Sequence, residues 1–467
     1  MDNPITGVCE DAAGTAARLA SFPQLVGIQL AVVSDAAIEV AAAGVADADA
    51  PGSAVTSSTR FRPGSITKLV TATLVLQCVD DGLVELDEPV TRHVPSFRLR
   101  RGADADRVKV AHLIAHSSGI DAGDLFVDTG DGDDAVERYV DLLADVGLLY
   151  EPGRWMSYCN AGFVLAGHLV ERVRDQPWED VVTERMLGPL GMESTSFLTG
   201  EAEEARPAEG RARGHLAALG AIAAVPDGTL AADPMCTRGL GPAGATLSST
   251  AGDLARLAAS HLGVRREDVP PVLAATSAAR MRELHARAPG GVTRMAGMGY
   301  AWQVWRGAGA DVPLLPRIGG ANPGQSGLIA VDPASRQAIV ALTNSDQGVG
   351  ALNLLLDGLG PLAVPDDEPP PEDLSAYVGS YASDLMTVDV EVGDAGGLVL
   401  RIGPIEHARV GAVLMSATFG VLTYPLTPVD RTTFSSTMGP VAFIDVDDDG
   451  RPQLLRWRMR ALRRRSS

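Results

Sequence analysis

The chain has 467 residues, 46% hydrophobic and 21% charged, which is enough for two or three domains and a sizeable core. Its formal net charge of −20 argues against nucleic acid or an anionic membrane as a partner. The four cysteines are far apart and form no C-x-x-C pair, so the sequence predicts neither a zinc site nor a disulfide framework. We therefore expect free thiols in a reducing compartment, and no cofactor.

The N-terminus has neither a basic segment nor an apolar stretch of the kind that signal peptides contain. The longest apolar runs, such as 216–225, have the length of core segments and are too short to span a bilayer. These two observations predict a cytoplasmic protein.

The first sixty residues predict one helix and a β-hairpin. Residues 11–19 have a helical pattern, and two strand-like runs, 26–33 and 37–43, are separated by a three-residue turn. This pairing indicates the start of an antiparallel sheet.

The next segment, 61–70, contains Gly-Ser-Ile-Thr-Lys followed by an apolar run without a helix breaker. Residues three apart share a helix face, so the amine of Lys68 is expected over the hydroxyl of Ser65. The unpaired N–H groups at a helix start favour negative charge, and a desolvated lysine can act as the base for a serine nucleophile.

The use of lysine supports this interpretation. The chain contains only two lysines, Lys68 and Lys109, and relies on arginine elsewhere. Lysine can release a proton when it is buried, whereas arginine cannot. The S-x-x-K pattern alone fits equally well a serine that caps a helix and a lysine on the surface.

Four further segments precede residue 250. A short helix at 110–114 leads into His116-Ser117-Ser118-Gly119, and Tyr158-Cys159-Asn160 precedes a predicted helix at 161–173. Residues 201–234 are of low complexity and are expected to form an irregular excursion that lines a substrate cleft. Residues 239–244 match G-x-G-x-x-G, but no strand precedes them, so dinucleotide binding is rejected.

The last third of the chain is rich in short strands. Runs at 326–331 and 337–343 are strand-like, and the five prolines of 361–371 indicate a linker. The strands expected beyond it, separated by Gly and Asp turns, predict a small antiparallel sandwich or barrel: 388–392, 398–402, 412–415, 422–426, 441–445 and 454–459. Residues 445–450 copy half of a calcium loop, but Arg456 stands where the loop needs Glu, so we expect a hairpin turn.

Taken in order, Ser65-x-x-Lys68, Tyr158-x-Asn160 and the Gly-rich segment 318–324 resemble the serine hydrolases of the penicillin-binding protein and class C β-lactamase superfamily. The resemblance runs from about Val26 to Leu359. It implies an α+β fold: a β-lactamase/transpeptidase-like catalytic domain over 1–360, a Pro-rich acidic linker over 361–371, and a lipocalin-like antiparallel β-barrel domain over 372–467.

The resemblance also implies roles for individual residues. Ser65 would be the acylated nucleophile, Lys68 would hold the proton relay, and Tyr158 would take the serine proton and pass it to the leaving group. A cationic neighbour such as Lys68 would favour the phenolate. The alternative for Tyr158 is a core aromatic residue with a satisfied hydroxyl.

The other family positions orient the substrate. Asn160 and Gly320 would position the substrate, with Asn160 also orienting Lys68, and the backbone N–H groups of Ser65 and Ala321 would form the oxyanion hole. Asn160 could instead cap the helix that follows it. His116 lies in a loop that the family uses to brace the site, and we interpret it as structural.

The third motif departs from the family pattern. The family places Lys or His where this chain has Ile318. A register shifted by one residue would place Arg317 there, but Asn322-Pro323-Gly324 fits the first register better. The loss of a polar group argues against a β-lactamase and against a carboxypeptidase that reads a free carboxylate.

The family includes peptidases, esterases and stand-alone thioesterases that release and cyclise nonribosomal peptides. An apolar third motif in a cytoplasmic member favours a cyclase that takes a peptidyl thioester from a carrier protein. The peptide would have a D-residue at its acylating end. The alternatives are a cytoplasmic esterase or D-stereospecific aminopeptidase, and an inactive penicillin-binding sensor.

Overall fold

The structure is a computed structural model. It describes residues 4–123, 125–198, 210–218, 221–226, 233–264, 266–288, 295–305, 315–348, 350–351, 356, 373–383, 386–393, 396–402, 422–437, 439–457 and 459–465. The predicted linker at 361–371 and the predicted strand at 412–415 lie outside these ranges, so both stay predictions.

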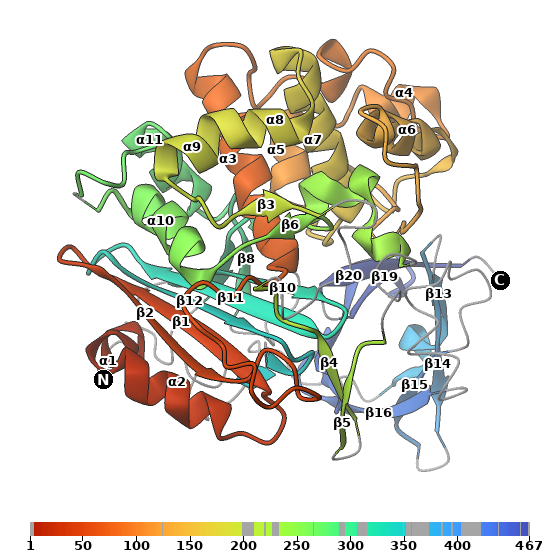
Figure 1. Cartoon of the computed structure of the whole chain (residues 1–467). Helices are drawn as coiled ribbons and strands as arrows, with labels where there is room; N and C mark the ends of the chain where they lie inside the picture. Colours follow the sequence, from red (N-terminus) through yellow and green to blue (C-terminus); the bar gives the residue numbers. More distant parts are fainter. Residues whose placement is uncertain are drawn as a thin grey trace.

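An antiparallel sheet of eight strands forms the centre of the catalytic part (Figure 1). In spatial order its strands are β2 (Ile38–Gly44), β1 (Gly27–Val33), β12 (Gln337–Thr343), β11 (Gln325–Asp332), β10 (Leu315–Asn322), β9 (Gln303–Trp305), β8 (Met295–Met298) and β7 (Ala286–Arg287). The predicted hairpin is confirmed as β1 paired with β2. The sheet joins the two ends of the catalytic part, because β1 also pairs with β12.

Two N-terminal helices, α1 (Pro4–Glu10) and α2 (Ala12–Ala20), cover one face of this sheet (Figure 1). Asp11 caps α2, with its carboxylate accepting a hydrogen bond from the Gly14 N–H, 2.9 Å away. The helices bury apolar side chains such as Leu19 against Leu30 and Leu328 of the sheet. This packing fixes the outer layer of the fold.

The other face carries the larger helical layer (Figure 1). Its helices are α3 (Thr67–Asp80), α4 (Gly102–Ala105), α5 (Val110–Ile114), α6 (Ala135–Asp141), α7 (Asn160–Arg174), α8 (Trp178–Val182), α9 (Gly188–Leu190), α10 (Ala251–Leu262) and α11 (Ala275–Met281). Every residue of α3 from Thr67 to Cys78 is buried. A helix that is apolar on all sides belongs in the core, and α3 therefore passes through the centre of this layer.

Two small two-stranded sheets complete this part of the molecule. One pairs β3 (Ser196–Phe197) with β6 (Leu247–Ser248). The other pairs β4 (His215–Ala218) with β5 (Ala221–Ala224). The second lies within the predicted irregular excursion at 201–234, which therefore contains two regular paired strands; residues 201–209, 219–220 and 227–232 of that excursion lie outside the described ranges.

The C-terminal part is a closed antiparallel barrel, as the resemblance implied. Its strands are β13 (Gly379–Ala382), β14 (Thr387–Val392), β15 (Leu398–Ile402), β16 (Leu422–Pro428), β17 (Thr433–Ser435), β18 (Val441–Val446), β19 (Pro452–Trp457) and β20 (Arg460–Arg464). Aromatic side chains including Tyr377, Tyr381 and Phe443 fill its interior. The Asp-rich segment 445–450 falls at the turn that joins β18 to β19.

The barrel packs against the catalytic part through an apolar contact. Leu149 and Tyr150, just before the Tyr158 motif, form one buried cluster with Ile444, Leu454 and Ala461 of the barrel. The turn between β19 and β20 consequently lies beside the segment that carries Tyr158.

Among the described residues, the helices are too short or too polar to span a membrane.

Candidate active site

Ser65, the predicted nucleophile, lies on a tight turn at the start of the central helix. Gly64 has φ +57° and opens a single 3₁₀ turn, Gly64–Ile66, which runs directly into α3. Lys68 lies in the first turn of α3 and is 1% exposed. Its Nζ donates hydrogen bonds to Ser65 Oγ at 2.9 Å and to the Ala243 carbonyl at 2.5 Å.

The phenol of Tyr158 reaches the same oxygen from a different segment. Its hydroxyl donates a hydrogen bond to Ser65 Oγ over 2.6 Å. The Nζ of Lys68 lies 4.9 Å from the centre of the Tyr158 ring. The structure thus brings together the hydroxyl, amine and phenol that the sequence predicted for the site. The Tyr158 hydroxyl bonds to Ser65, so Tyr158 is not simply a core aromatic residue.

Strand β10 lies against the nucleophile at backbone distance. A Cβ added to Gly320 would lie 1.9 Å from the Pro63 carbonyl oxygen and 2.8 Å from the Ser65 nitrogen. A Cβ on Gly64 would lie 2.6 Å from the Ala321 nitrogen. Only glycine permits this approach, which brings the segments that carry the backbone nitrogens of residues 65 and 321 into contact, where the sequence predicts the oxyanion hole.

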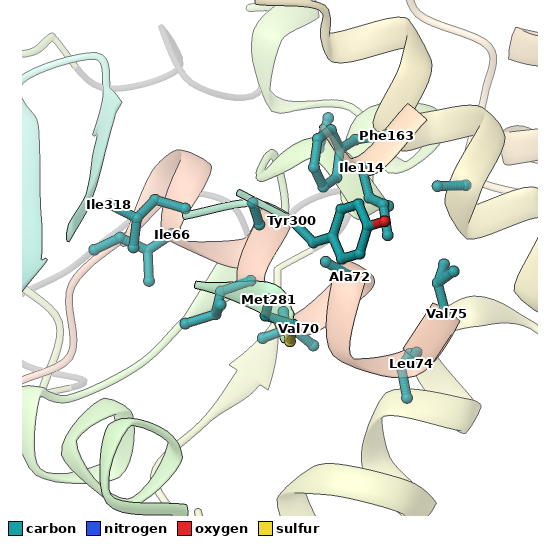
Figure 2. Close-up of a cluster of buried hydrophobic side chains, with 14 of the residues drawn as sticks. Ile66, Val70, Ala72, Leu74, Val75, Ile114, Phe163, Met281, Tyr300 and Ile318 are labelled. Carbon is teal, nitrogen blue, oxygen red and sulfur yellow. The ribbon is translucent and has the colours of Figure 1, made fainter. Parts of the chain in front are cut away.

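The third motif has the first of the two registers considered, in which Ile318 stands at the position of the family's Lys or His. Ile318 is 2% exposed and packs in the same core cluster as Ile66, and Figure 2 shows the two side by side. Neighbouring strand residues face opposite sides of a sheet, and Arg317 accordingly lies over the Trp305 ring, 3.4 Å from its centre. The cation of Arg317 therefore cannot replace the Lys or His of the family pattern.

Asn160 is the first residue of α7, and the cap of that helix is Cys159, whose sulfur accepts a hydrogen bond from the Gly162 N–H. The Asn160 side chain lines the pocket beside Ser65 and donates a 2.9 Å hydrogen bond to the Gly123 carbonyl. It is therefore a pocket residue that also fixes the 120–123 loop, rather than the helix cap that sequence reasoning left as an alternative.

The pocket next to Ser65 is mostly apolar. Its side chains and backbone come from Ser65, Phe126, Asn160, Met235, Leu240, Ala243, Gly244, Ala245, Ala321 and Asn322. None of these residues carries an ionisable acid or base. The pocket thus suits an uncharged acyl group.

Sequence reasoning missed part of this wall. The Gly-rich segment 239–244 forms a 3₁₀ helix, Arg238–Ala243, that ends against the nucleophile turn. A Cβ on Gly244 would lie 2.4 Å from the Gly64 carbonyl oxygen, and Ala243 supplies the carbonyl that holds Lys68. The glycines were the visible signal, but they marked close backbone packing rather than a phosphate site.

Sequence reasoning also missed Arg460 of the barrel. Its guanidinium carbon lies 4.7 Å from the centre of the Tyr158 ring, and its Nη1 donates to the Tyr158 carbonyl. The Tyr158 N–H in turn donates to the Met459 carbonyl at 2.7 Å. No local pattern distinguishes this arginine from its neighbours in the Arg-rich end of the chain.

One titratable group beside the site has a strongly displaced pKa. Burial, and then the positive charges of Lys68 and Arg460, hold the pKa of His116 well below its usual value. Its imidazole is consequently neutral at physiological pH. It lies stacked on the Tyr158 ring, with the two ring centres 4.2 Å apart.

The fold and this site define a serine acyl-enzyme protein. A family model described as Beta-lactamase matches residues 15–357. A curated relative, Penicillin-binding protein 4 of Amycolatopsis lactamdurans, is 36% identical over 369 residues, which cover 76% of this chain and 92% of that protein. The chain belongs to the β-lactamase family, the family of serine hydrolases that includes penicillin-binding proteins.

Other similar proteins differ in how much of the chain they cover. Esterase EstB of Burkholderia gladioli is 36% identical over 214 residues, 41% of this chain and 54% of the esterase. The solved structure of SurE with D-Leu is 26% identical with a TM-score of 0.73, covering 98% of this chain and 100% of SurE. D-amino acid amidase from Ochrobactrum anthropi, solved with L-phenylalanine amide, is 25% identical with a TM-score of 0.60, covering 75% of this chain and 97% of the amidase.

Proposed function

We propose that this protein is a stand-alone thioesterase that accepts a carrier-bound nonribosomal peptide on Ser65 and cyclises it head to tail. The observation that carries the proposal is the combination of a complete acylation group with an apolar third motif. Lys68 and Tyr158 both bond to Ser65 Oγ, whereas buried Ile318 replaces the cation that the family places there. A thioester has no free carboxylate at the reacting end and therefore does not need that cation.

The proposed reaction has two balanced steps. In the first, Ser65 Oγ bonds to the thioester carbonyl carbon, its proton passes to the Tyr158–Lys68 pair, and the thiol leaves with that proton. In the second, the amine at the other end of the peptide attacks the ester carbon, and its proton returns to Ser65 Oγ through the same pair. The backbone N–H groups of Ser65 and Ala321 hold the oxyanion in both steps.

Two similar structures support a D-configured residue at the acylating end. SurE has been solved with D-Leu, and the amidase from Ochrobactrum anthropi acts, by its title, on D-amino acid amides. The likeness to SurE also includes the barrel, since it covers 98% of this chain. The uncharged pocket formed by Phe126, Met235 and Leu240 fits an apolar side chain at that residue.

Hydrolysis is the second candidate, favoured by the likeness to Esterase EstB and to the amidase. In that case water, rather than an amine, resolves the acyl-enzyme, and the protein is an esterase or a D-stereospecific aminopeptidase. A third possibility is an inactive penicillin-binding sensor. The first two differ in the fate of the Ser65 ester and the third in whether that ester forms, so product analysis together with the mass of the protein separates them.

The test uses the full chain and an N-acetylcysteamine thioester of a linear peptide whose last residue is D-Leu. We expect a cyclic product, one water lighter than the linear acid, and no product from the Ser65→Ala variant. The same peptide ending in L-Leu serves as the stereochemical control and should react slowly. Linear acid alone, across several D-terminal peptides, supports the hydrolase, and no mass gain on Ser65 with any ester supports the sensor.

The proposal implies a peptidyl carrier protein as partner, in the cytoplasm where such synthesis takes place. The same peptide loaded on a carrier protein should be off-loaded at a lower half-saturating concentration than the small thioester. Equal half-saturation by the two donors would argue that the carrier is not recognised.

A further inference from the structure

We propose that His116 is a positioning residue that holds the phenol of Tyr158 against Ser65. The resemblance implied only that the loop containing His116 braces the site, and it assigned His116 no role in the reaction. The inference depends on the acylation of Ser65, which is part of the proposed function, but not on whether the ester is then cyclised or hydrolysed. Three separate contacts of one residue support it.

The first two contacts fix the backbone on both sides of Tyr158. The His116 carbonyl accepts a hydrogen bond from the Ser157 N–H at 2.9 Å. The His116 Nδ1 accepts one from the Cys159 N–H at 3.0 Å. Residues 157 and 159 are thus both held by His116, and the residue between them carries the phenol.

The third contact fixes the ring. The imidazole lies 4.2 Å from the centre of the Tyr158 ring at an interplanar angle of 26°, which is a stacked arrangement. Phe163 of α7 packs against the imidazole at 4.8 Å. Tyr158 therefore cannot tilt toward His116, and its hydroxyl stays 2.6 Å from Ser65 Oγ.

The backbone of His116 is suited to this position. Its φ is +55°, a left-handed conformation that few residues other than glycine adopt, and that histidine adopts more readily than most. This conformation allows the carbonyl and the side chain of one residue to contact the same segment. Substitution by a β-branched residue would be strained for that reason alone.

The geometry also sets the protonation state. Because Nδ1 accepts the Cys159 N–H, it carries no proton, and the neutral imidazole has its proton on Nε2. That Nε2 is buried and has no hydrogen-bond partner among the described residues. The charged groups that face the ring, Lys68 and Arg460, are both cations and disfavour a second proton. A charged imidazole would lose the bond to Cys159 and place a third cation around the phenol.

Two substitutions separate the contacts. His116→Asn keeps a side-chain acceptor near the position of Nδ1 and tolerates the left-handed backbone, but it removes the stacked ring. His116→Phe keeps the ring and removes the acceptor. His261→Asn is the matched control, because His261 is an equally buried histidine that bonds to Thr73 in the core.

The readout is the rate of Ser65 acylation by p-nitrophenyl acetate, measured between pH 5 and pH 10. We expect His116→Asn and His116→Phe each to lower kcat/KM for acylation by about tenfold per folded molecule. We also expect the pH midpoint of acylation to shift in both variants and to stay unchanged in His261→Asn. Circular dichroism at each pH restricts the comparison to folded protein.

Acylation within twofold of the parent, with an unchanged pH midpoint, in either folded His116 variant would overturn the proposal. An equal loss in His261→Asn would overturn it as well, because the effect would then be general destabilisation. Since the aryl ester reports acylation alone, a failure of the cyclisation test leaves this one intact.

Discussion

The guanidinium of Arg460 lies over the ring of Tyr158, 4.7 Å from its centre, although 302 residues separate the two in the chain. Arg460 belongs to the barrel and Tyr158 to the catalytic part. The barrel therefore supplies a cation to the active site. The third motif of this chain has lost the cation that the family pattern places there.

Replacing Arg460 by Met is expected to slow acylation while leaving the fold intact. A cation near the phenol stabilises the negative charge that develops when it gives up its proton, and a cation–π contact contributes about 0.5–2 kcal/mol. We expect a loss of roughly 2- to 30-fold in kcat/KM, measured with an aryl ester. The control is Arg463→Met, because Arg463 is exposed on the same strand, β20. Equal acylation rates in the two variants would show that Arg460 does not contribute to the reaction.

Replacing Lys68 by Arg is expected to slow acylation severely although the charge is kept. Arginine does not release its proton at working pH, so the relay at Ser65 Oγ would be lost, at a cost of about 10²–10⁴ in rate. Lys109→Arg is the matched control, since Lys109 is the other lysine and forms an exposed ion pair with Asp87. Intact-protein mass spectrometry after exposure to an ester reports the outcome. Acylation of the Lys68→Arg protein as fast as that of Lys109→Arg would contradict the relay.

Replacing Gly320 by Ala is expected to displace β10 from the nucleophile turn. The added carbon would lie 1.9 Å from the Pro63 carbonyl oxygen, so one of the two backbones must move. Misalignment of one oxyanion donor typically costs about 10²–10³ in kcat. The comparison is Gly52→Ala, where nothing lies within 4 Å of the added carbon. If kcat in Gly320→Ala stays near that of Gly52→Ala, the oxyanion assignment is wrong.

Buried neutral histidines are expected to make the protein less stable in mild acid. Burial, and then the charge of Arg282, lowers the pKa of His261 from 6.5 to about 3. Below pH 6.5 the unfolded chain binds a proton there that the folded chain does not, so the free energy of unfolding falls as the pH falls, until about pH 3. The slope is about 1.4 kcal/mol per pH unit for one such group.

Urea unfolding at pH 7, 6 and 5 measures this effect. The difference in unfolding free energy between the parent and His261→Gln should shrink as the pH decreases, because the variant lacks the titrating group. A difference that stays constant over this pH range would show that His261 is not held neutral by the fold.

Local rules were sufficient to predict the part of the site that Ser65 and Lys68 form. The spacing of Ser65 and Lys68 fixes their relation because a helix repeats its faces every three to four residues. The hairpin at the start of the sheet and a small antiparallel β part at the C-terminal end followed in the same way from short alternating runs and turn residues, whereas the closure of that part into a barrel of eight strands did not. The family match, which spans residues 15–357, confirmed the resemblance drawn from three short motifs.

The helix start at Asn160 shows where local rules fail. An asparagine before an apolar run fits a cap, yet the cap is Cys159 and the Asn160 side chain reaches Gly123 instead. The choice depends on which acceptor lies nearby in space, and the loop at 120–123 is not adjacent in the sequence.

The sequence by itself determined the pairing of Ser65 with Lys68, the order of the motifs and the presence of a second, all-β part, because each depends on neighbours within a few residues. Only the tertiary structure decided that Ile318 faces the core while Arg317 faces away, that Ala243 holds Lys68, and that Arg460 and His116 enclose the Tyr158 ring. These relations depend on how β10, the 3₁₀ helix at 238–243 and the barrel pack around α3. Packing of that kind is set by the burial of apolar surface from the whole chain, which no short window of residues contains.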